Sequence, residues 1–411
     1  MKRPKYLPFF RPSIEEDDVS AVTQCLRDGW LTTGARVGEL EREFAAKTGV
    51  RDAIALNSAT SGLQLGLIAL GVGPGDEVVT PALTFVAGAN CIRQLGAVPV
   101  FCDVDPQTLC ITPETILPTL SEKTKAIIPM QFGGRPVGIG QIVQLGRQRG
   151  IAVLEDAAHA VGTLDDGLWP GALSDCAVYS LYATKNITSG EGGIFVTNRD
   201  DLARRVRTLA LHGMSRDAWA RYERGGSWEY DVVAIGYKCN MADLLAALGV
   251  SQFRRIDELQ RRREALARRY LHGLRGLRGV HPVSPFLTLP QRHSWCLFAV
   301  RVDPALAGVT RGEVIDGLRR QNIGTSVHFI PTHLFSAYRE SARVALPNTE
   351  RIWQELVSLP LYPDMALSDV DDVVSSLQRV LSLDSVKSRP EAVSAANVPQ
   401  HQQGSNNPTP R

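Results

Sequence analysis

Short apolar segments of strand length alternate with helical stretches through the first half of this 411-residue chain. Several of them are apolar at nearly every position instead of alternating with polar residues, as is typical of strands covered by helices on both faces. The segments are residues 53–56, 77–80, 98–102, 125–129, 151–154, 176–181 and 193–197. The pattern predicts an α/β fold in which helices sandwich a mainly parallel sheet.

Helical patterns precede the first of these segments. Residues 13–16 (Ser-Ile-Glu-Glu) have the form of a helix capping box, and apolar residues then recur at helical spacing up to Gly29. Val37, Leu40 and Phe44 mark a second helix. The N-terminal segment is therefore expected to be helical.

The length of the chain exceeds what one hydrophobic core usually organises, so we expect two domains. Residues 1–250 would form a large α/β domain that includes the N-terminal segment. Residues 251–385 would form a smaller α+β domain with strands at 295–302 and 324–329 and helices near 311–320 and 368–381. Residues 386–411 are rich in Ser, Pro, Gln and Asn, which predicts a disordered tail.

Composition excludes several classes of protein. The formal net charge is +2 and the hydrophobic content is 44%, which is ordinary for a soluble globular chain. No apolar run approaches the roughly 20 residues that a bilayer span needs, and no signal peptide is evident. Scattered cysteines without a C-x-x-C pair favour a reducing cytoplasm over a disulfide framework, and they argue against a zinc site. The seven are Cys25, Cys91, Cys102, Cys110, Cys176, Cys239 and Cys296.

A long helical stretch from about Asn240 carries several arginines between residues 261 and 269. Such a run could bind nucleic acid, but it is interspersed with Glu258 and Glu264, as on a solvated helix face. We therefore expect no nucleic-acid partner.

Lys185 follows the apolar segment 176–181 and precedes a glycine-rich turn at residues 190–193. Most lysines are solvated surface charges. Here, however, Ser180 ends a predicted strand five residues earlier, and glycines let a chain turn tightly around a bound ligand. Lys185 is therefore a candidate reactive amine.

Asp156 comes directly after the apolar run 151–154 and Glu155. A carboxylate at that position would be partly desolvated and would need a cationic partner. His159 follows three residues later and could either flank a bound ring or satisfy a local hydrogen bond.

Residues 57–62 (Asn-Ser-Ala-Thr-Ser-Gly) connect a predicted strand to a predicted helix. This geometry directs backbone N–H groups and the Thr60 and Ser61 hydroxyls at an anion such as a phosphate, although Ser and Thr are also ordinary helix caps. Phe85 follows another strand and could stack against a planar ring or belong to the core.

An amine, a desolvated carboxylate and a phosphate-binding turn are the groups that pyridoxal 5′-phosphate (PLP) chemistry requires. The amine forms a Schiff base with the cofactor aldehyde, and the carboxylate keeps the pyridine nitrogen protonated. The sequence therefore predicts an enzyme with Lys185 and Asp156 as its catalytic residues.

Taken together, these motifs resemble the DegT/DnrJ/StrS family of PLP-dependent nucleotide-sugar aminotransferases, which have fold type I. The resemblance extends from residues 29–34 (Gly-Trp-Leu-Thr-Thr-Gly) to residues 358–363 (Ser-Leu-Pro-Leu-Tyr-Pro). It implies a large domain with a mainly parallel sheet and a smaller C-terminal α+β domain. It also implies homodimers in which each subunit lends a residue to the partner's phosphate site.

The resemblance assigns roles to individual residues. It implies Lys185 as the covalent anchor and Asp156 at the pyridine nitrogen. The other cofactor-binding candidates are Ala59, Thr60 and Ser180 at the phosphate, Phe85 and His159 at the ring, and Asn240 or, less favoured, Lys238 reaching across the dimer. The substrate-side candidates are Thr33, His328 and Tyr338.

The resemblance also implies the reaction. Glutamate would load the amino group, leaving pyridoxamine 5′-phosphate and 2-oxoglutarate, and a nucleotide-linked keto-sugar would then collect it for amino-sugar and polysaccharide biosynthesis. Residues 236–240, Trp295 and residues 324–329 look closer to members that aminate C4 of a 4-keto-6-deoxy hexose than to members that act at C3.

The sequence departs from the family pattern at three positions, and two other functions compete with amino transfer. Gln131 and Cys296 stand where relatives often have histidine, and His159 stands where many have glutamine. One alternative is a PLP-dependent sugar dehydratase, but those relatives replace the lysine by histidine. The other is a non-catalytic PLP-binding regulatory protein.

Overall fold

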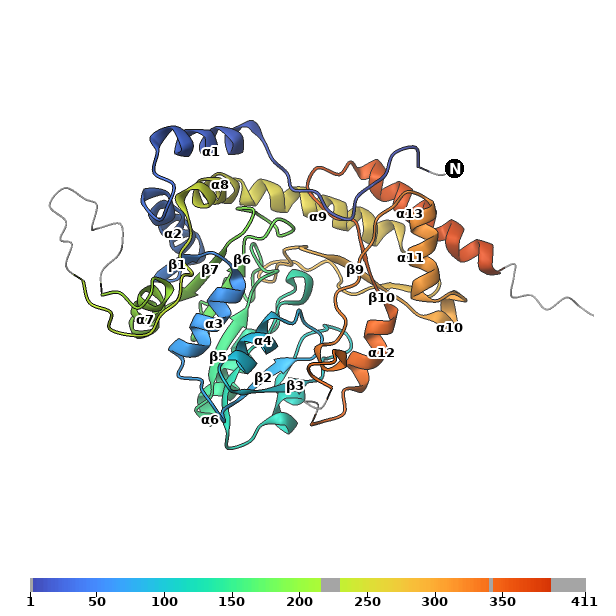
Figure 1. Cartoon of the computed structure of the whole chain (residues 1–411). Helices are drawn as coiled ribbons and strands as arrows, with labels where there is room; N and C mark the ends of the chain where they lie inside the picture. The colour runs from blue at the N-terminus through green and yellow to red at the C-terminus, as the bar shows by residue number, and fades with distance from the viewer. Residues whose placement is uncertain (1–2, 216–229, 340–342, 386–411) are drawn as a thin grey trace, which may run out of the picture.

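The computed structural model describes residues 3–215, 230–339 and 343–385 (Figure 1). The predicted tail at 386–411 lies outside the described residues. The strands are β1 Asp52–Leu56, β2 Glu77–Pro81, β3 Val98–Cys102, β4 Thr124–Ile127, β5 Ala152–Asp156, β6 Cys176–Ser180, β7 Gly193–Thr197, β8 Val280–Pro282, β9 Phe298–Val302 and β10 Leu356–Leu359. The helices are α1 Glu16–Asp28, α2 Ala35–Thr48, α3 Ala59–Ala69, α4 Ala87–Gln94, α5 Pro113–Ile116, α6 Ile139–Arg149, α7 Asp200–Ala210, α8 Asp243–Arg254, α9 Ile256–Gly273, α10 Pro304–Ala307, α11 Arg311–Arg320, α12 Pro347–Glu355 and α13 Leu367–Ser385.

A seven-stranded sheet forms the larger part of the molecule, with strand order β1-β7-β6-β5-β4-β2-β3. Neighbouring strands from β3 to β6 pair in parallel, whereas β7 runs antiparallel to both β6 and β1. The predicted mainly parallel sheet is thus confirmed, and all seven predicted segments form its strands.

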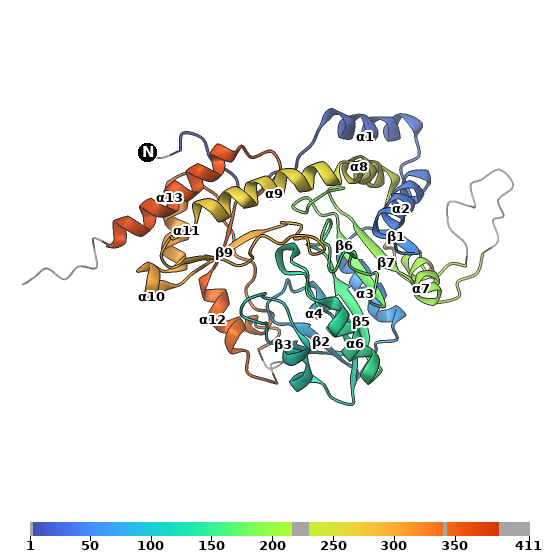
Figure 2. The same ribbon diagram turned by 180° about the vertical axis from the view of Figure 1, so that it is seen from behind.

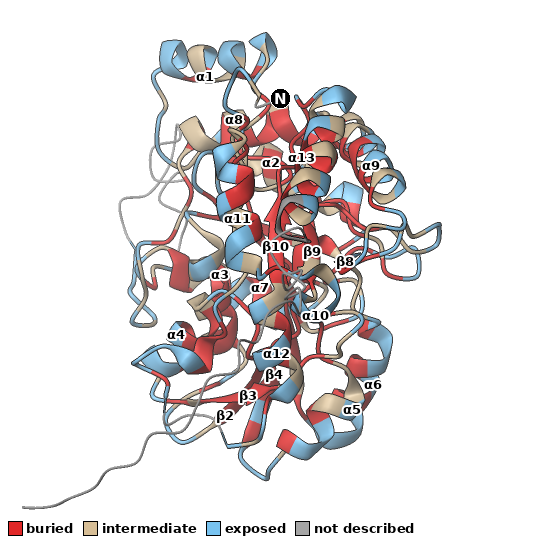
Figure 3. Cartoon of the chain, turned by 90° about the vertical axis from the view of Figure 1, so that its right-hand side faces the viewer, coloured by how far each residue is buried: buried red, intermediate tan, exposed pale blue. Residues whose placement is uncertain are grey.

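Helices cover both faces of this sheet, which explains why its strands are apolar throughout. On one face, alternate strand residues such as Leu56 and Val178 pack against α3, α4 and α7. On the other face, Ala55 and Tyr179 pack against α2 and α8. Figure 3 shows the buried residues concentrated on the strands and on the inward sides of the helices. The sandwich predicted from the sequence is confirmed.

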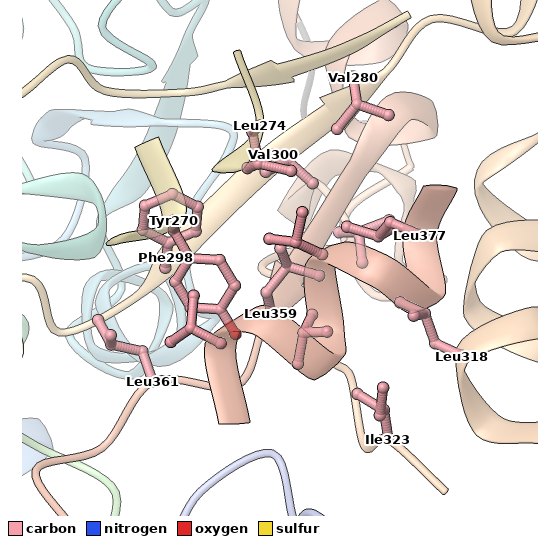
Figure 4. Packing of buried hydrophobic residues seen from close by; sticks show 14 of the residues in the cluster. Tyr270, Leu274, Val280, Phe298, Val300, Leu318, Ile323, Leu359, Leu361 and Leu377 are labelled. Carbon is pink, nitrogen blue, oxygen red and sulfur yellow. The ribbon is translucent and has the colours of Figure 1, made fainter. Parts of the chain in front are cut away.

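A three-stranded antiparallel sheet, in the order β10-β9-β8, lies towards the C-terminus of the chain. Its core joins residues of α9, α11 and α13, including Tyr270, Leu318 and Leu377, with Phe298 and Leu359 of the strands (Figure 4). The long helix α9 starts at α8 and extends towards α11 and α13 in both views (Figures 1 and 2). The division into domains at residue 250 stays a prediction.

Three local predictions differ from the structure. The helix α1 is capped by Glu15 and Asp18, not by Ser13, because the Ser13 hydroxyl instead donates to the Asp364 carboxylate (2.6 Å). The long helical stretch is two helices, since the backbone at Arg255 leaves the helical conformation (φ −93°, ψ 6°). Strands β8 and β10 were not predicted from the sequence.

Residues 324–329 do not form the predicted strand. Only Ser326 pairs with a strand residue, in an isolated bridge to Ser358 of β10. The backbone at residues 322–324 pairs instead with the N-terminal segment. The Leu7 N–H donates to the Asn322 carbonyl, and the Gly324 N–H donates to the Leu7 carbonyl. An added Cβ at Gly324 would lie 2.7 Å from the Phe9 nitrogen, so only glycine permits this approach.

Within the part of the chain that the structure describes, every helix is too short or too polar to span a bilayer.

Candidate active site

A cleft opens beyond the carboxyl ends of the central strands, where ligands bind in sheets of this kind. Asp156 is the last residue of β5 and Ser180 the last of β6. The cleft holds ≈ 1120 Å³ of empty space, including the part open to solvent. Of the residues predicted from the sequence, it brings together Ala59, Thr60, Phe85, Asp156, His159, Ser180, Lys185 and His328.

The N-terminus of α3 forms one end of the cleft. Ser58 caps the helix by accepting a hydrogen bond from the Ser61 N–H (3.1 Å), and Ala59 and Thr60 begin its first turn. The strand β7 starts against this turn, so that a Cβ added to Gly193 would lie 2.5 Å from the Ala59 nitrogen. A helix N-terminus exposed to a cleft attracts anions through its N–H groups and its dipole.

Asp156 is 7% exposed. Burial raises the pKa of its carboxyl group, while a hydrogen bond from the Ala158 N–H to Oδ1 (3.1 Å) and the nearby charge of Lys185 lower it. A carboxylate in this setting is stabilised by any cation that enters the cleft.

The turn after β6 places Lys185 in the cleft. Its N–H bonds the Tyr182 carbonyl (2.9 Å), and the side chain of the next residue, Asn186, donates to the Ser294 carbonyl (2.7 Å). The charge of Lys185 influences the pKa of Asp156, His159 and His328. The lysine amine thus lies among the other polar groups of the cleft, as its sequence context predicts.

Both cleft histidines are neutral near pH 7. Burial lowers the pKa of His159 well below 6.5 and that of His328 to about 4, and the Lys185 charge lowers both further. The His159 Nδ1 atom accepts a hydrogen bond from the Gly133 N–H (3.3 Å), which assigns its ring proton to Nε2. His328 Nδ1 is bonded to the Ser358 hydroxyl (2.8 Å).

Phe85 is 59% exposed in the cleft, so the alternative of a core residue is wrong. Its ring lies 6.2 Å from that of Phe329, which in turn stacks on the His159 ring at 5.8 Å. An exposed phenylalanine beside a carboxylate and an amine offers a face for a planar ligand.

Four predicted residues do not line the cleft of their own chain. Asn240 donates to the Thr33 hydroxyl (2.6 Å) and accepts from the Lys238 amine (2.5 Å). Tyr338 lies in a separate buried cluster, where it packs on Phe101 and its hydroxyl donates to Asn90 (2.6 Å). The roles of these residues stay predictions.

Other cleft residues were missed. Tyr182, Thr184 and Glu191 line the cleft and flank Lys185 in the sequence, so their position next to the predicted amine could have identified them. Phe329 also lines it and directly follows the predicted His328, but no sequence pattern indicates that its ring stacks on His159.

Comparison with known proteins supports the chemistry that the cleft suggests. The sequence profile of the DegT/DnrJ/EryC1/StrS aminotransferase family matches residues 12–378. The spore coat polysaccharide biosynthesis protein SpsC of Bacillus subtilis (strain 168) is 44% identical over 384 residues, covering 92% of this chain and 98% of SpsC.

Two solved structures share the fold over nearly their whole length. The sugar aminotransferase Spr1654 of Streptococcus pneumoniae, described as putative and solved in a PLP form, superposes with a TM-score of 0.84 at 31% identity, covering 92% of this chain and 99% of Spr1654. A pyridoxamine 5′-phosphate (PMP) form of Spr1654 matches equally well. DesI, solved in the presence of its TDP-sugar product, superposes with a TM-score of 0.82 at 29% identity, covering 94% of this chain and 95% of DesI.

The family match spans most of the chain, and the fold is that of the fold type I PLP-dependent transferases. The cleft contains a lysine, a buried carboxylate and a helix N-terminus. This chain therefore belongs to the DegT/DnrJ/EryC1/StrS aminotransferase family and is a PLP-dependent sugar aminotransferase.

Proposed function

We propose that this enzyme transfers an amino group from glutamate to C4 of a nucleotide-linked 4-keto-6-deoxy hexose. The observation that carries the proposal is the presence of Lys185 and Asp156 in one cleft that is wide enough for a cofactor and a sugar. Family dehydratases have histidine in place of this lysine, so Lys185 favours amino transfer over dehydration.

The residues of the cleft fit PLP. The start of α3 and the Ser180 hydroxyl can hold its phosphate, and the close approach of Gly193 keeps the phosphate site narrow. Asp156 has one carboxyl oxygen bonded to the Ala158 N–H, which leaves the other for the pyridine N–H. Phe85 supplies a face for the ring. We therefore assign these positions as the cofactor site.

Three groups of this chain perform the chemistry. PLP, when bound, withdraws electrons from the carbon that loses a proton. The Lys185 Nζ atom would hold the cofactor covalently and, when free, would take and return that proton. The buried Asp156 carboxylate holds a proton on the pyridine nitrogen, which a solvated carboxylate would do poorly because water screens its charge. The neutral His159 offers its Nε2 proton as a hydrogen-bond donor inside the cleft.

Two lines of support favour a nucleotide-linked 4-keto sugar as the acceptor. DesI was solved with a TDP-sugar product, and the similarity to DesI extends over 94% of this chain. The residues around Asn240, Trp295 and His328 resemble those of members that act at C4. The SpsC match suggests that the product enters polysaccharide biosynthesis.

We further propose that the enzyme is a cytoplasmic homodimer in which Asn240, or less favourably Lys238, contacts the phosphate in the partner's cleft. Asn240 and Lys238 lie outside the cleft of their own chain. All seven cysteines are free and buried, in keeping with a reducing compartment.

Spectroscopy and product analysis test the proposal. The purified protein incubated with PLP should absorb in the visible region and lose that band when glutamate is added. The glutamate-treated enzyme should then release no further 2-oxoglutarate until a 4-keto sugar is supplied. Candidate UDP-, GDP- and dTDP-linked sugars should be screened by this release. A wild-type protein that binds PLP but never responds to glutamate would exclude the proposed donor.

A further inference from the structure

A small pocket adjoins the cleft on the side of the three-stranded sheet. It shares His159, Thr184, Lys185 and His328 with the cleft. Its empty space, including the part open to solvent, is only ≈ 340 Å³, so it is too small for a nucleotide sugar. Its other walls are mainly apolar and come from the N-terminal segment, β10 and the residues before β9. They are formed by Phe9, Phe10, Cys296, Leu297, Leu359 and Leu361.

A fully buried arginine lies behind one wall of this pocket. Arg263 of α9 is 1% exposed, and its Nη1 atom donates to the Trp295 carbonyl (3.4 Å) and the Leu361 carbonyl (3.3 Å). Leu361 lines the pocket, and so does Cys296, the neighbour of Trp295. Burial lowers the pKa of Arg263 to about 10, while Cys296 and Asp364 raise it, so that the guanidinium stays charged near pH 7.

Among the described residues, no carboxylate forms an ion pair with Arg263 within 4.0 Å, and its Nε atom has no hydrogen-bond partner. The negative charge of Asp364 raises the pKa of Arg263. The Asp364 carboxylate, however, accepts a hydrogen bond from the Ser13 hydroxyl (2.6 Å) and lies 3.8 Å from Arg262. A buried charge without a close counter-ion is costly. An anionic ligand in the pocket would reduce that cost.

The pocket is therefore flanked by two cationic groups, Lys185 on one wall and Arg263 behind another, and no acidic side chain lines it. Apart from Thr184 and the neutral His159 and His328, its walls are apolar and suit methylene groups. A short aliphatic chain that ends in a carboxylate matches both properties, because the low-polarity walls strengthen the attraction of a negative charge to a buried cation.

We propose that this pocket binds the side-chain carboxylate of the amino donor and that Arg263 makes the enzyme prefer a dicarboxylic donor over a neutral one. The inference rests on the proposed function, in which glutamate is the donor. The donor's α-carbon must come next to the Lys185 amine, and the pocket begins at that residue. Arg263 does not line the pocket, and it attracts the donor carboxylate electrostatically through the pocket wall. It is therefore a specificity residue and not a catalytic residue.

The test compares glutamate with glutamine, its neutral counterpart of nearly equal size. The rate at which each donor removes the visible band of the PLP-loaded enzyme gives a glutamate-to-glutamine ratio of kcat/KM. Arg263→Met should lower this ratio about tenfold or more, which corresponds to about 1.4 kcal/mol. Arg263→Lys should retain most of the ratio, and Arg261→Met, an exposed change on the same helix, should leave it unchanged. A merely structural role of Arg263 would slow both donors alike.

A second pair of variants keeps the test independent of the folding of Arg263→Met. Cys296→Asp places a negative charge on the pocket wall beside Arg263, whereas Cys296→Asn places a neutral group of the same size there. The aspartate should lower the ratio and the asparagine should not. Calorimetric binding of glutarate, which cannot react, should weaken in Arg263→Met and Cys296→Asp but not in Cys296→Asn.

The outcomes separate the two proposals. If the wild type reacts with glutamate and the ratio is unchanged in both Arg263→Met and Cys296→Asp, the donor pocket is refuted and the proposed function stands. If the PLP-loaded wild type does not react with glutamate, the proposed function fails and the donor pocket fails with it.

Discussion

The Gln131 amide donates a hydrogen bond to the Glu155 carboxylate, with 2.5 Å between Nε2 and Oε2, and both side chains are only 1% exposed. The other carboxyl oxygen accepts from the Gly171 N–H and from the Ser174 hydroxyl, both at 2.7 Å. Burial raises the pKa of Glu155 to about 7, although these hydrogen bonds lower it. Glu155 directly precedes Asp156 on β5, so this network fixes the strand end that carries the carboxylate proposed to contact the pyridine nitrogen.

The contribution of Glu155 to stability should fall as the pH rises from about 4.5 to about 7. The folded state holds the Glu155 proton more tightly than the unfolded chain, where the ordinary pKa is 4.5. Stability that is fully present below pH 4.5 is therefore lost as the pH rises through the folded pKa, on the order of 3 kcal/mol. Urea unfolding of wild type and Glu155→Gln across this range measures the effect. The difference between the two proteins should change with pH, and a constant difference would contradict the prediction.

Replacement of Lys185 should abolish amino transfer. Lys185→Ala should bind PLP without the visible band of the lysine-bound cofactor, and its turnover should fall by at least about three orders of magnitude because anchor and proton carrier are both lost. Lys185→Arg should behave in the same way, since a guanidinium stays protonated. Absorption spectra and 2-oxoglutarate release measure both effects. Substantial turnover in either variant would show that another group carries the proton.

Asp156→Asn should separate cofactor binding from chemistry. The amide keeps the size of the side chain but cannot hold a positive charge on the pyridine nitrogen, so the rate with glutamate should fall about 10² to 10³-fold. PLP affinity, measured by fluorescence titration, should fall much less because the phosphate site is unchanged. An unaltered rate would mean that Asp156 does not contact the ring nitrogen.

Gly193→Ala should damage the phosphate site. The new Cβ would lie 2.5 Å from the Ala59 nitrogen and 2.6 Å from the Ser58 carbonyl oxygen, and backbone atoms cannot yield as a flexible side chain can. We expect a loss of about 1–3 kcal/mol in the free energy of unfolding and weaker PLP binding. Gly140→Ala is the matched control, because a Cβ in that helical position meets nothing within 4 Å. Equal stability of the two variants would contradict the close approach.

Mixing two inactive variants should restore activity if Asn240 acts across a dimer. A Lys185→Ala subunit still supplies Asn240, and an Asn240→Ala subunit still supplies Lys185, so a mixed dimer would contain one complete site. Equal amounts, unfolded and refolded together, should regain about a quarter of the wild-type activity. If light scattering shows that dimers form but no activity is recovered, Asn240 does not act in the partner's site.

Local sequence signals determined much of this protein. Uninterrupted apolar segments specified the strands of the large sheet, because a strand buried on both faces excludes polar residues on either side. Lys185, Asp156 and Thr60 were predicted as site residues because each lies at or just after the end of a strand, and the carboxyl ends of parallel strands meet at one edge of a sheet. The resemblance to a family rested on the same residues.

Only the tertiary structure decided what depends on contacts between distant segments. Residues 324–329 read as a strand, yet the N-terminal segment pairs with the backbone before them. No pattern in the sequence indicated that the Tyr338 ring packs on Phe101, and its substrate role stays a prediction. In the sequence, Arg263 is one of several arginines on a predicted charged helix. It is buried behind the pocket next to Lys185 because α9 packs on the loop at residue 295 and on the residues after β10. A sequence records the order of such residues, but burial and ion pairing depend on which segments the fold brings together.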